Sequence, residues 1–243
     1  MMIGRRLSTI ASMAIKCNVV ADIGTDHAYI PISLVENGTA TKAIASDIAQ
    51  GPLDKARSNI GAKALSGSIE TRLGSGLDTL EPGEADVIVI SGMGGILMRD
   101  ILIRGEAVSR SATQLVLSPH SDIPEVRRFL VESGYFIVDE NIVKEEGKYY
   151  FILDVRNVKP ADTDDKISTL GMCDNDYLFG NCLKRKKGSI FGEYLMREID
   201  KSNLIIKTLN VNSPMSPRIQ ELNDYIKQCK EALEIWRKEN LRS

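Results

Sequence analysis

Short apolar runs alternate with stretches of helical spacing through the first two thirds of the chain. The apolar runs span residues 19–23, 43–46, 69–73, 85–90 and 115–117. Between two of these runs, small or apolar residues recur every four positions, as on one face of a helix. These residues are Pro52, Ala56, Ile60 and Ala64. Strands that alternate with helices of this length are typical of βαβ units, which build a parallel sheet. The run ADVIVI (85–90) is nearly continuous in apolar character, which favours a strand buried on both faces.

The last two apolar runs of this region, residues 135–143 and 149–155, are separated by a link of five residues. So short a link permits a hairpin but not the crossover that parallel strands require. We therefore expect an α/β sheet of five parallel strands that ends in an antiparallel pair. An all-parallel sheet of the NAD-binding type would not end in this way, whereas the seven-stranded sheet of methyltransferases does.

The pattern changes after residue 158. Lys159-Pro160 and the aspartates that follow are typical of a linker. Beyond Gly188, two segments have a repeat of four and three residues, and prolines at 214 and 217 separate them. The repeat positions are Leu195, Ile199, Ser202, Ile206 and Leu209, then Ile219, Leu222, Ile226, Cys229, Leu233 and Trp236. This heptad spacing predicts an antiparallel helical hairpin with coiled-coil packing, or alternatively two amphipathic helices packed on the first domain. We accordingly expect a domain at 1–158 and a helical domain at 159–243.

Composition and charge exclude several classes of protein. The formal net charge is −2, which neither requires nor excludes a nucleic-acid partner, because binding depends on a local basic patch. The four cysteines lack CxxC spacing and there are two histidines, so neither a zinc site nor a disulfide framework is expected. No apolar stretch approaches the roughly 20 residues of a membrane span, and no signal peptide is evident. We expect a cytoplasmic globular protein without a metal.

The first predicted strand ends in a turn with one glycine and two acids, VADIGTDH. Gly24 can adopt a positive φ and leaves room for a ligand, and ligands of open α/β sheets bind at this edge. A dinucleotide-binding turn would have glycine at the position of Asp26. The carboxylates of Asp22 and Asp26 would repel a pyrophosphate and attract a cation, such as the amino group and sulfonium of S-adenosylmethionine. Alternatively, the two acids only cap the turn and the following helix.

Three further segments lie at the same predicted edge. Asp47 ends the second strand about 20 residues after the turn, where an acid accepts hydrogen bonds from ribose hydroxyls, in NAD enzymes as well. Residues 74–77 follow the third strand and are placed to border an adenine, unless they form only a glycine-rich turn. Residues 91–95 contain three glycines in four positions, which lets a ligand approach the backbone. We expect residues 91–95 to form the floor of the pocket for the target base. Alternatively, they make only a tight strand-to-helix connection.

Taken together, these segments resemble the bacterial tRNA (adenine-N1)-methyltransferases of the TrmK type, which modify nucleotide 22 of tRNA. The resemblance rests on VADIGTDHAYIPISLVENG (20–38), AIASDIAQGPLDKARSNI (43–60), RLGSGL (72–77), ADVIVISGMGG (85–95) and LVLSPHSDIPEVRRFLVESGY (115–135). The helical hairpin also matches the layout of the family. The resemblance implies a class I (Rossmann-like) methyltransferase fold, S-adenosylmethionine as cofactor, and tRNA as partner, bound in part by the helical domain. The chain departs from the family pattern at Ser75, where an acid or amide is expected, and at Ser118, where a glutamine is expected.

The turns and the resemblance together define three sets of site residues. The cofactor-binding set is Asp22, Gly24, Asp26, His27, Asp47, Ile48, Gly74, Gly76, Leu77, Ser91, Gly92 and Met93. The substrate-binding set is Arg5, Arg6, Gly94, Gly95, Pro119, His120, Lys184, Arg185, Lys186 and Lys187. The catalytic set is Asp26, His27 and Tyr29. Alternatively, His120 is a structural loop residue and the basic run 184–187 is solvated surface.

The implied reaction needs little activation of the nucleophile, because adenine N1 has an in-plane lone pair. Catalysis then depends on holding N1 in line with the methyl group, and the base must be unpaired or flipped out because N1 lies on its Watson–Crick edge. The methylated base is cationic. We expect Asp26 to stabilise this charge or accept the proton, with His27 and Tyr29 shaping the pocket. An equally open alternative is that Asp26 only holds the amino group of the cofactor.

Three other functions fit parts of the pattern. The first is a methyltransferase of the same fold that acts on a small molecule or a protein. The second is a non-catalytic RNA-binding protein that keeps the fold as a scaffold. The third is a dehydrogenase, which the charge of Asp26 and the terminal hairpin disfavour. A heptad hairpin can be satisfied within one chain, so a monomer is favoured while the oligomeric state stays open.

Overall fold

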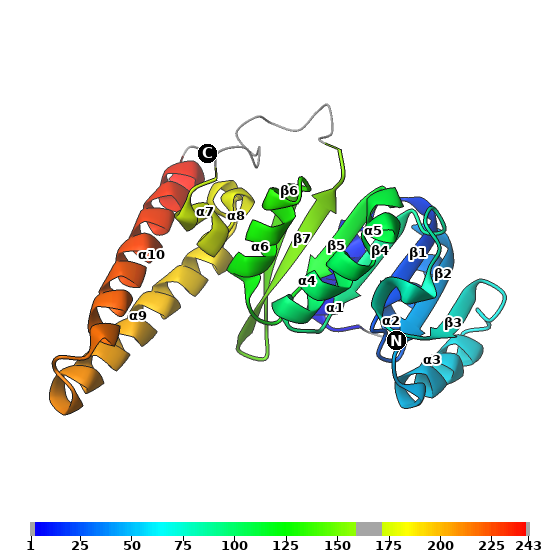
Figure 1. Ribbon diagram of the computed structural model, residues 1–243, viewed down its shortest axis with the longest axis horizontal. Coiled ribbons are helices and arrows are strands. Elements are labelled where there is room, and N and C mark those ends of the chain that lie inside the picture. The colour runs from blue at the N-terminus through cyan, green and yellow to red at the C-terminus, as the bar shows by residue number, and fades with distance from the viewer. Residues whose placement is uncertain (1–2, 159–171, 242–243) are drawn as a thin grey trace. The chain divides into compact units, whose positions relative to one another are not determined.

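The computed structural model describes residues 3–158 and 172–241, and the chain divides into two compact units, Met1–Gly171 and Met172–Ser243 (Figure 1). The described part of the first unit is a sheet covered by helices, and that of the second unit is helical. The linker predicted at Lys159-Pro160 and the following aspartates lies outside the described residues.

Within residues 3–158, seven strands form one sheet in the order β3-β2-β1-β4-β5-β7-β6 (Figure 1). The strands are β1 (Cys17–Ile23), β2 (Ala40–Asp47), β3 (Ile69–Leu73), β4 (Val87–Ser91), β5 (Gln114–Ser118), β6 (Phe136–Glu145) and β7 (Lys148–Arg156). Strands β1 to β5 pair in parallel, and β7 is antiparallel to both of its neighbours, β5 and β6. The expected parallel sheet with an antiparallel terminal pair is therefore confirmed, and its last strand is inserted between β5 and β6.

A two-residue turn, Glu146 and Gly147, joins β6 to β7. Both residues have a positive φ, 48° and 75°. A type I′ turn requires this conformation at both positions, and its twist matches that of the strands of a hairpin. The turn sets the register in which Glu145 pairs with Lys148.

Helices cover both faces of the sheet and enclose two hydrophobic clusters. One cluster includes residues of α1 (Arg5–Met13), α2 (Tyr29–Glu36) and α3 (Gln50–Ala62); the other includes residues of η1 (Gly76–Thr79), α4 (Gly95–Arg104), α5 (Glu106–Ser111) and α6 (Ile123–Glu132). Side chains of β4 alternate between them, as strand geometry requires: Ile88 and Ile90 join the α4–α6 cluster, and Val87 and Val89 join the α1–α3 cluster. Helix α1, which packs against α2 and β6, was not predicted from the sequence.

In the second unit, α9 (Ser189–Asn212) and α10 (Pro217–Leu241) pack against each other as a helical hairpin (Figure 1). The predicted hairpin is therefore confirmed. Heptad positions form its buried seam, where Leu195, Ser202, Leu222, Ile226, Cys229 and Leu233 are buried. Gly192 is required at this contact, because a Cβ there would lie 2.6 Å from the ring of Trp236. Two short helices, α7 (Asp174–Phe179) and α8 (Asn181–Arg185), precede the hairpin and pack against α10.

Candidate functional site

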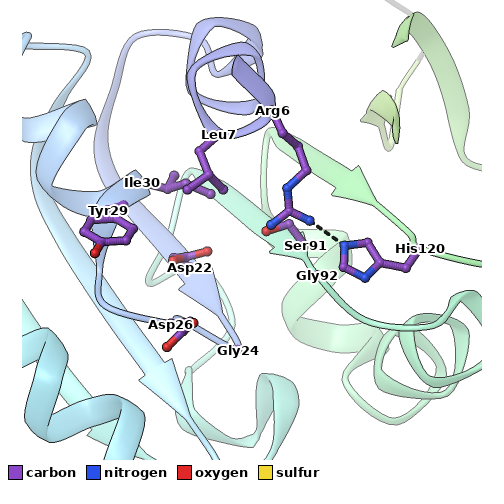
Figure 2. A pocket seen from close by; sticks show the side chains of 10 residues that line it. All are labelled: Arg6, Leu7, Asp22, Gly24, Asp26, Tyr29, Ile30, Ser91, Gly92 and His120. Carbon is purple, nitrogen blue, oxygen red and sulfur yellow. Dashed lines mark hydrogen bonds between the residues drawn. The ribbon is translucent and has the colours of Figure 1, made fainter. Parts of the chain in front are cut away.

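A cavity of about 320 Å³ opens at the carboxyl ends of β1 and β4, beside α1 and α2 (Figure 2). Its wall consists of Arg6, Leu7, Asp22, Gly24, Asp26, Tyr29, Ile30, Ser91, Gly92 and His120. All of these except Leu7 and Ile30 belong to the sets predicted from the sequence. The cavity has the size of a small-molecule site and lies at the edge where open α/β sheets bind ligands.

The glycine turn leaves β1 with a backbone conformation that suits glycine alone. Gly24 has a φ of +76°, and a Cβ there would lie 2.9 Å from the Cε of Met93. The amides of Gly24 and Thr25 both donate to the carbonyl of Ser46, at 2.9 and 2.8 Å. The turn is therefore anchored to β2 on one side and packs against the loop after β4 on the other.

Two residues in the left-handed conformation follow the turn. His27 has a φ of 66° and Ala28 a φ of 57°, and each such residue costs about 1–2 kcal/mol because its Cβ approaches the following carbonyl. The surroundings hold this conformation, since Ala28 is fully buried and the side chain of Asn59 donates to the carbonyl of His27 at 2.9 Å. Backbone strain of this kind is typical of ligand-binding turns.

The two acids of the turn have different surroundings. Asp22 is 4% exposed and accepts a 2.7 Å hydrogen bond from Thr25 Oγ1. Burial raises the pKa of Asp22 to about 6; the hydrogen bond from Thr25 opposes this shift and the charge of Asp47 adds to it. The side chain of Asp26 is 72% exposed, and its Oδ1 lies 3.2 Å from His27 Nε2. Asp22 is therefore a buried member of the turn, whereas Asp26 presents its carboxylate at the surface of the cavity.

The helix after the turn, α2, begins at Tyr29, which lines the cavity. The Tyr29 ring stacks on His27, with 5.3 Å between ring centroids and 4° between the planes. Among the residues that the structure describes, no side chain makes a capping hydrogen bond at the N-terminus of α2. The alternative that Asp22 and Asp26 cap this helix is therefore wrong. Its other part, that the acids cap the turn, holds for Asp22, which accepts a hydrogen bond from Thr25.

The end of β2 presents Asp47 and Ile48 at the same edge of the sheet. Asp47 Oδ1 accepts a 2.8 Å hydrogen bond from the Ala49 amide, and the Asp47 carbonyl accepts one of 3.0 Å from the Gly74 amide. Ile48 is 73% exposed. This edge therefore combines a carboxylate with an exposed apolar side chain, two groups that suit a ribose and an aromatic base.

The loop after β3 contains a side chain that faces away from this edge. Leu77 is 2% exposed and packs in the α4–α6 cluster, against Gly105. The Leu77 side chain therefore does not face this edge, and the prediction that Leu77 binds the cofactor applies only to its backbone. Gly74 and Gly76 are tightly packed, because a Cβ would lie 2.6 Å from Thr79 Cγ2 at Gly74 and 3.1 Å from Ile101 at Gly76.

The loop after β4 separates into two parts. Ser91 and Gly92 line the cavity. Gly94 and Gly95 instead pack against the loop after β5, where a Cβ at Gly95 would lie 2.5 Å from the carbonyl oxygen of Ser121. A glycine is therefore needed at position 95 because α4 comes close to that loop. This agrees with the alternative given for residues 91–95, a tight strand-to-helix connection.

His120 and Arg6 meet at the cavity from elements that are far apart in the sequence. Arg6 Nη1 makes a hydrogen bond with His120 Nε2 (Figure 2). The Arg6 guanidinium also lies 5.1 Å from the centroid of the Tyr150 ring. Burial, and then the charges of Arg6 and Lys148, lower the pKa of His120 from its ordinary value. Pro119 beside it is buried. His120 is therefore part of the cavity wall as well as of the loop.

The predicted basic cluster in the second unit is only partly exposed. Lys184 is 3% exposed, forms an ion pair with Asp176 and donates to Asn175 Oδ1 at 3.2 Å. The prediction that Lys184 contacts phosphate is therefore corrected, because its ammonium is enclosed within the unit. Arg185 and Lys187 are exposed and Lys186 is half-buried. In the first unit, Arg5 is exposed on α1 but does not line the cavity.

Two side chains of the cavity wall, Leu7 and Ile30, were not predicted, and neither was Tyr150, whose ring contacts Arg6 and His120. The spacing of Leu7, Ile10 and Ala14 is the helical signal that would have indicated α1. Tyr150 carries no such signal, because its place beside Arg6 depends on β7 being inserted into the sheet.

Two absences apply to residues 3–158 and 172–241. No group of three or more His, Cys, Asp or Glu side chains there is arranged to hold a metal ion. Across the same residues, no helix combines the length and apolar character needed to cross a membrane.

Comparison with known proteins identifies the class of this fold and site. The profile of a family described as "Methyltransferase domain" matches residues 3–153, which span the sheet and the cavity. The chain is therefore a methyltransferase-domain protein.

The relatives narrow this class. The chain is 32% identical over 236 residues to the Bacillus subtilis tRNA (adenine(22)-N(1))-methyltransferase, covering 96% of this chain and 97% of that protein. The crystal structure of B. subtilis TrmK has a TM-score of 0.81 at 30% identity and covers 96% and 99% of the two chains. M. capricolum TrmK in complex with S-adenosyl-homocysteine has a TM-score of 0.81 at 27% identity and covers 97% and 99%. The chain belongs to the TrmK family.

Proposed function

We propose that this protein transfers a methyl group from S-adenosylmethionine to N1 of an adenine in tRNA, at nucleotide 22. The observation that supports this most is a cavity lined by Asp22, Gly24, Asp26 and Ser91, in a chain that matches the B. subtilis tRNA (adenine(22)-N(1))-methyltransferase over 96% of its length. A tRNA substrate in turn implies a cytoplasmic enzyme.

The residues of the turn fit a cationic cofactor. Asp22 and Asp26 bring two carboxylates to one small cavity, and Gly24 keeps its floor open. S-adenosylmethionine supplies an electrophilic methyl group when it is bound. In our proposal Asp22 and Asp26 attract its amino group and sulfonium, Asp47 accepts hydrogen bonds from its ribose, and the exposed Ile48 covers its adenine.

Asp26 has a second role in this proposal. Its carboxylate is exposed at the cavity wall, whereas that of Asp22 is buried and bonded to Thr25. Asp26 is therefore the acid that can meet a base entering from solvent. As N1 is alkylated the base becomes cationic, and Asp26 stabilises that charge and accepts the proton that later leaves the exocyclic amino group.

The target base enters unpaired in this proposal. N1 lies on the Watson–Crick edge, so a paired adenine cannot present it. Tyr29, stacked on His27, offers an aromatic face at the cavity, and base–aromatic stacking contributes about 1–3 kcal/mol per base. His27 then acts through Tyr29, as a support for the ring.

The remaining basic side chains are proposed as phosphate contacts. Arg5 in the first unit and Arg185, Lys186 and Lys187 in the helical unit keep surface exposure. Phosphate contacts fix the position of an RNA without reading its sequence. The helical unit is accordingly proposed to bind tRNA, and we expect a monomer to suffice because the seam of its hairpin is buried within one chain.

The proposal is tested by incubating the protein with unmodified tRNA and labelled S-adenosylmethionine, followed by nucleoside mapping. We expect label in 1-methyladenosine at nucleotide 22. Label that enters an RNA-free cell extract but not tRNA would support a methyltransferase with another acceptor. Calorimetry that detects no cofactor binding would support a non-catalytic RNA-binding protein.

A further inference from the structure

The hydrogen bond between Arg6 and His120 determines where the histidine ring holds its proton. Arginine has donors but no acceptor, so Arg6 Nη1 can bond to His120 Nε2 only if that nitrogen offers its lone pair. A neutral imidazole has one protonated nitrogen and one acceptor. With Nε2 as the acceptor, the proton is on Nδ1.

Contacts from three different elements hold this arrangement in place. The Tyr150 ring of β7 lies 5.1 Å from the Arg6 guanidinium and 5.6 Å from the His120 ring, at 59° to it. The amide of Arg6 donates to Glu145 Oε1 of β6 at 3.3 Å. The amide of His120 donates to the Met93 carbonyl at 2.9 Å, which ties the histidine to the loop after β4. His120 is exposed at the surface, and these contacts restrict the position of its ring there.

The two cations that act on His120, Arg6 and Lys148, oppose its protonation, and the carboxylates of Asp22 and Asp26 line the same cavity. Arg6 on α1 and Lys148 on β7 are the cations that act on the ring, Tyr150 on β7 is a neutral neighbour, and Asp122 in its own loop accepts a hydrogen bond from Ser121. Burial and the two cations together lower the pKa of His120. The ring is therefore neutral and adds no positive charge to that of Arg6, in a cavity where the substrate itself becomes cationic.

The Nδ1–H group is the side of the ring that a substrate can use. His120 lines the cavity, and within residues 3–158 and 172–241 its hydrogen bonds are those of Nε2 and of its own backbone amide. An adenine offers N3 and N7 as further acceptors besides N1. A donor that takes one of these nitrogens orients the base while it leaves N1 free to react.

We propose that Arg6 is a positioning residue that fixes His120 as the neutral Nδ1–H tautomer, and that this N–H donates to a ring nitrogen of the target purine other than N1. This inference rests on the proposed function for its substrate, but the tautomer itself is a property of the free protein. Its two parts can therefore be tested separately.

The first test is nuclear magnetic resonance of the free protein labelled with ¹⁵N-histidine. The chain has two histidines, His27 and His120, so a His27→Asn variant assigns both sets of signals. We expect the Nδ1–H tautomer for His120 at neutral pH and a pKa below 6.5. In Arg6→Met we expect a mixture of tautomers and a higher pKa, and in Arg6→Lys, which keeps a donor and a charge, partial retention of Nδ1–H. An Nε2–H tautomer or an imidazolium in the wild type, or no change in Arg6→Met, would overturn the role of Arg6.

The second test compares two amide substitutions in single-turnover methylation of tRNA. In His120→Asn the side-chain NH₂ takes the place of Nδ1–H, whereas in His120→Gln the amide takes the place of Nε2 and no donor remains at the first position. We expect His120→Gln to be about tenfold slower than the wild type, as expected when one hydrogen bond is removed, and His120→Asn to be less impaired than His120→Gln because it retains a donor at the first position. Cofactor affinity, measured by calorimetry, should be the same in both variants.

The outcomes separate the inference from the proposed function. Equal rates in His120→Asn and His120→Gln, or a faster His120→Gln, would overturn the role of Nδ1–H. If the wild type methylates no tRNA, the proposed function fails and the substrate half of the inference fails with it, whereas the ¹⁵N measurement still decides the tautomer.

Discussion

The carboxylates of the glycine turn, Asp22 and Asp26, differ mainly in their access to water. Asp22 is enclosed with Thr25 and has a raised pKa, while the side chain of Asp26 is 72% exposed beside His27. Removing the Asp22 carboxylate is therefore expected to change how stability depends on pH, and removing the Asp26 carboxylate is expected to change the rate of methylation. Two substitutions at the residue scale make this difference measurable.

Asp26→Asn removes the charge from the cavity wall and retains the volume of the side chain. We expect single-turnover methylation at saturating cofactor and tRNA to fall by about 10²-fold, the typical contribution of a positioned acid or base. Asp54→Asn on α3 is the control, because its carboxylate is similarly exposed and bonds to Arg57 away from the cavity. A normal rate combined with a weaker affinity for S-adenosylmethionine would show that Asp26 holds only the cofactor.

Asp22→Asn is expected to make unfolding less sensitive to pH. The folded-state pKa of Asp22, about 6, lies above the ordinary value of 3.8, so the folded protein binds this proton more tightly than the unfolded chain. Stability therefore falls as the pH rises from about 4 to about 6 and is lowest above that, by up to about 3 kcal/mol from this group. The variant should be the more stable protein at pH 8, with the difference vanishing near pH 4, in urea unfolding at several pH values. A difference that stays constant with pH would contradict the raised pKa.

At the scale of the elements, hydrophobic pattern was sufficient to predict the strands of the sheet and the helical hairpin. Most of the run 85–90 became β4, and the link predicted at 144–148 contains the two-residue hairpin turn, with its other residues in β6 and β7. The pattern did not reveal the order of the last two strands in the sheet. The spacing of apolar residues is the same whether β7 lies at the edge or between β5 and β6. Tyr150, whose position depends on that order, was missed for this reason.

Candidate site residues were easier to predict where the local sequence determines their position than where the position depends on contacts with distant parts of the chain. Gly24 and Asp26 follow a strand directly, so their place at the edge of the sheet is determined by local sequence. Lys184 was assigned to a surface because basic runs usually are solvated, whereas Asp176, eight positions earlier, draws it into the interior. Burial of a charged side chain depends on a partner that composition does not identify.

Gly95 offers a test of the packing between α4 and the loop after β5. A methyl group at this position would meet the backbone of Ser121 at 2.5 Å and that of Asp122 at 2.9 Å, neither of which can rotate away. We expect Gly95→Ala to lower the free energy of unfolding by about 1–3 kcal/mol, as overpacking does. Gly51→Ala is the matched control, since Gly51 lies in α3 with no atom within 4 Å of the added Cβ. Helix propensity predicts that this control is neutral or slightly stabilising. Equal unfolding temperatures for both variants would contradict the packing argument.

At the scale of the whole molecule, the two units contribute different kinds of chemistry. The first unit contains the cavity and its acids, and the second presents exposed basic side chains on a helical support. The hairpin is long and slender, and its buried seam is supplied by the heptad positions of α9 and α10. The short helices α7 and α8 also pack against α10 within this unit.

Neutralising the exposed basic residues tests the division of labour between the units. In a variant with Arg185→Gln, Lys186→Gln and Lys187→Gln, we expect weaker tRNA binding and a shallower dependence of log K on log salt, by about 0.7–0.9 for each phosphate that is no longer neutralised. The affinity for S-adenosylmethionine should be unchanged. Lys184→Gln is the contrast, because it breaks a buried ion pair: we expect it to destabilise the helical unit without changing the salt slope. A triple variant with the wild-type slope would reject this surface as an RNA-binding surface.

The insertion of β7 between β5 and β6 has a consequence for the life of each new chain. Synthesis proceeds from the N-terminus, and until residue 156 has left the ribosome β5 remains an open edge strand and α1 lacks the strands on which it rests. The amide of Arg6 bonds to Glu145, 139 positions further along, so the wall of the cavity closes only when the two ends of the unit meet. Closures over such sequence distances are slow. Until this pairing is complete, the nascent chain exposes a strand edge that can pair with other chains, and one side of its cavity wall is unsupported.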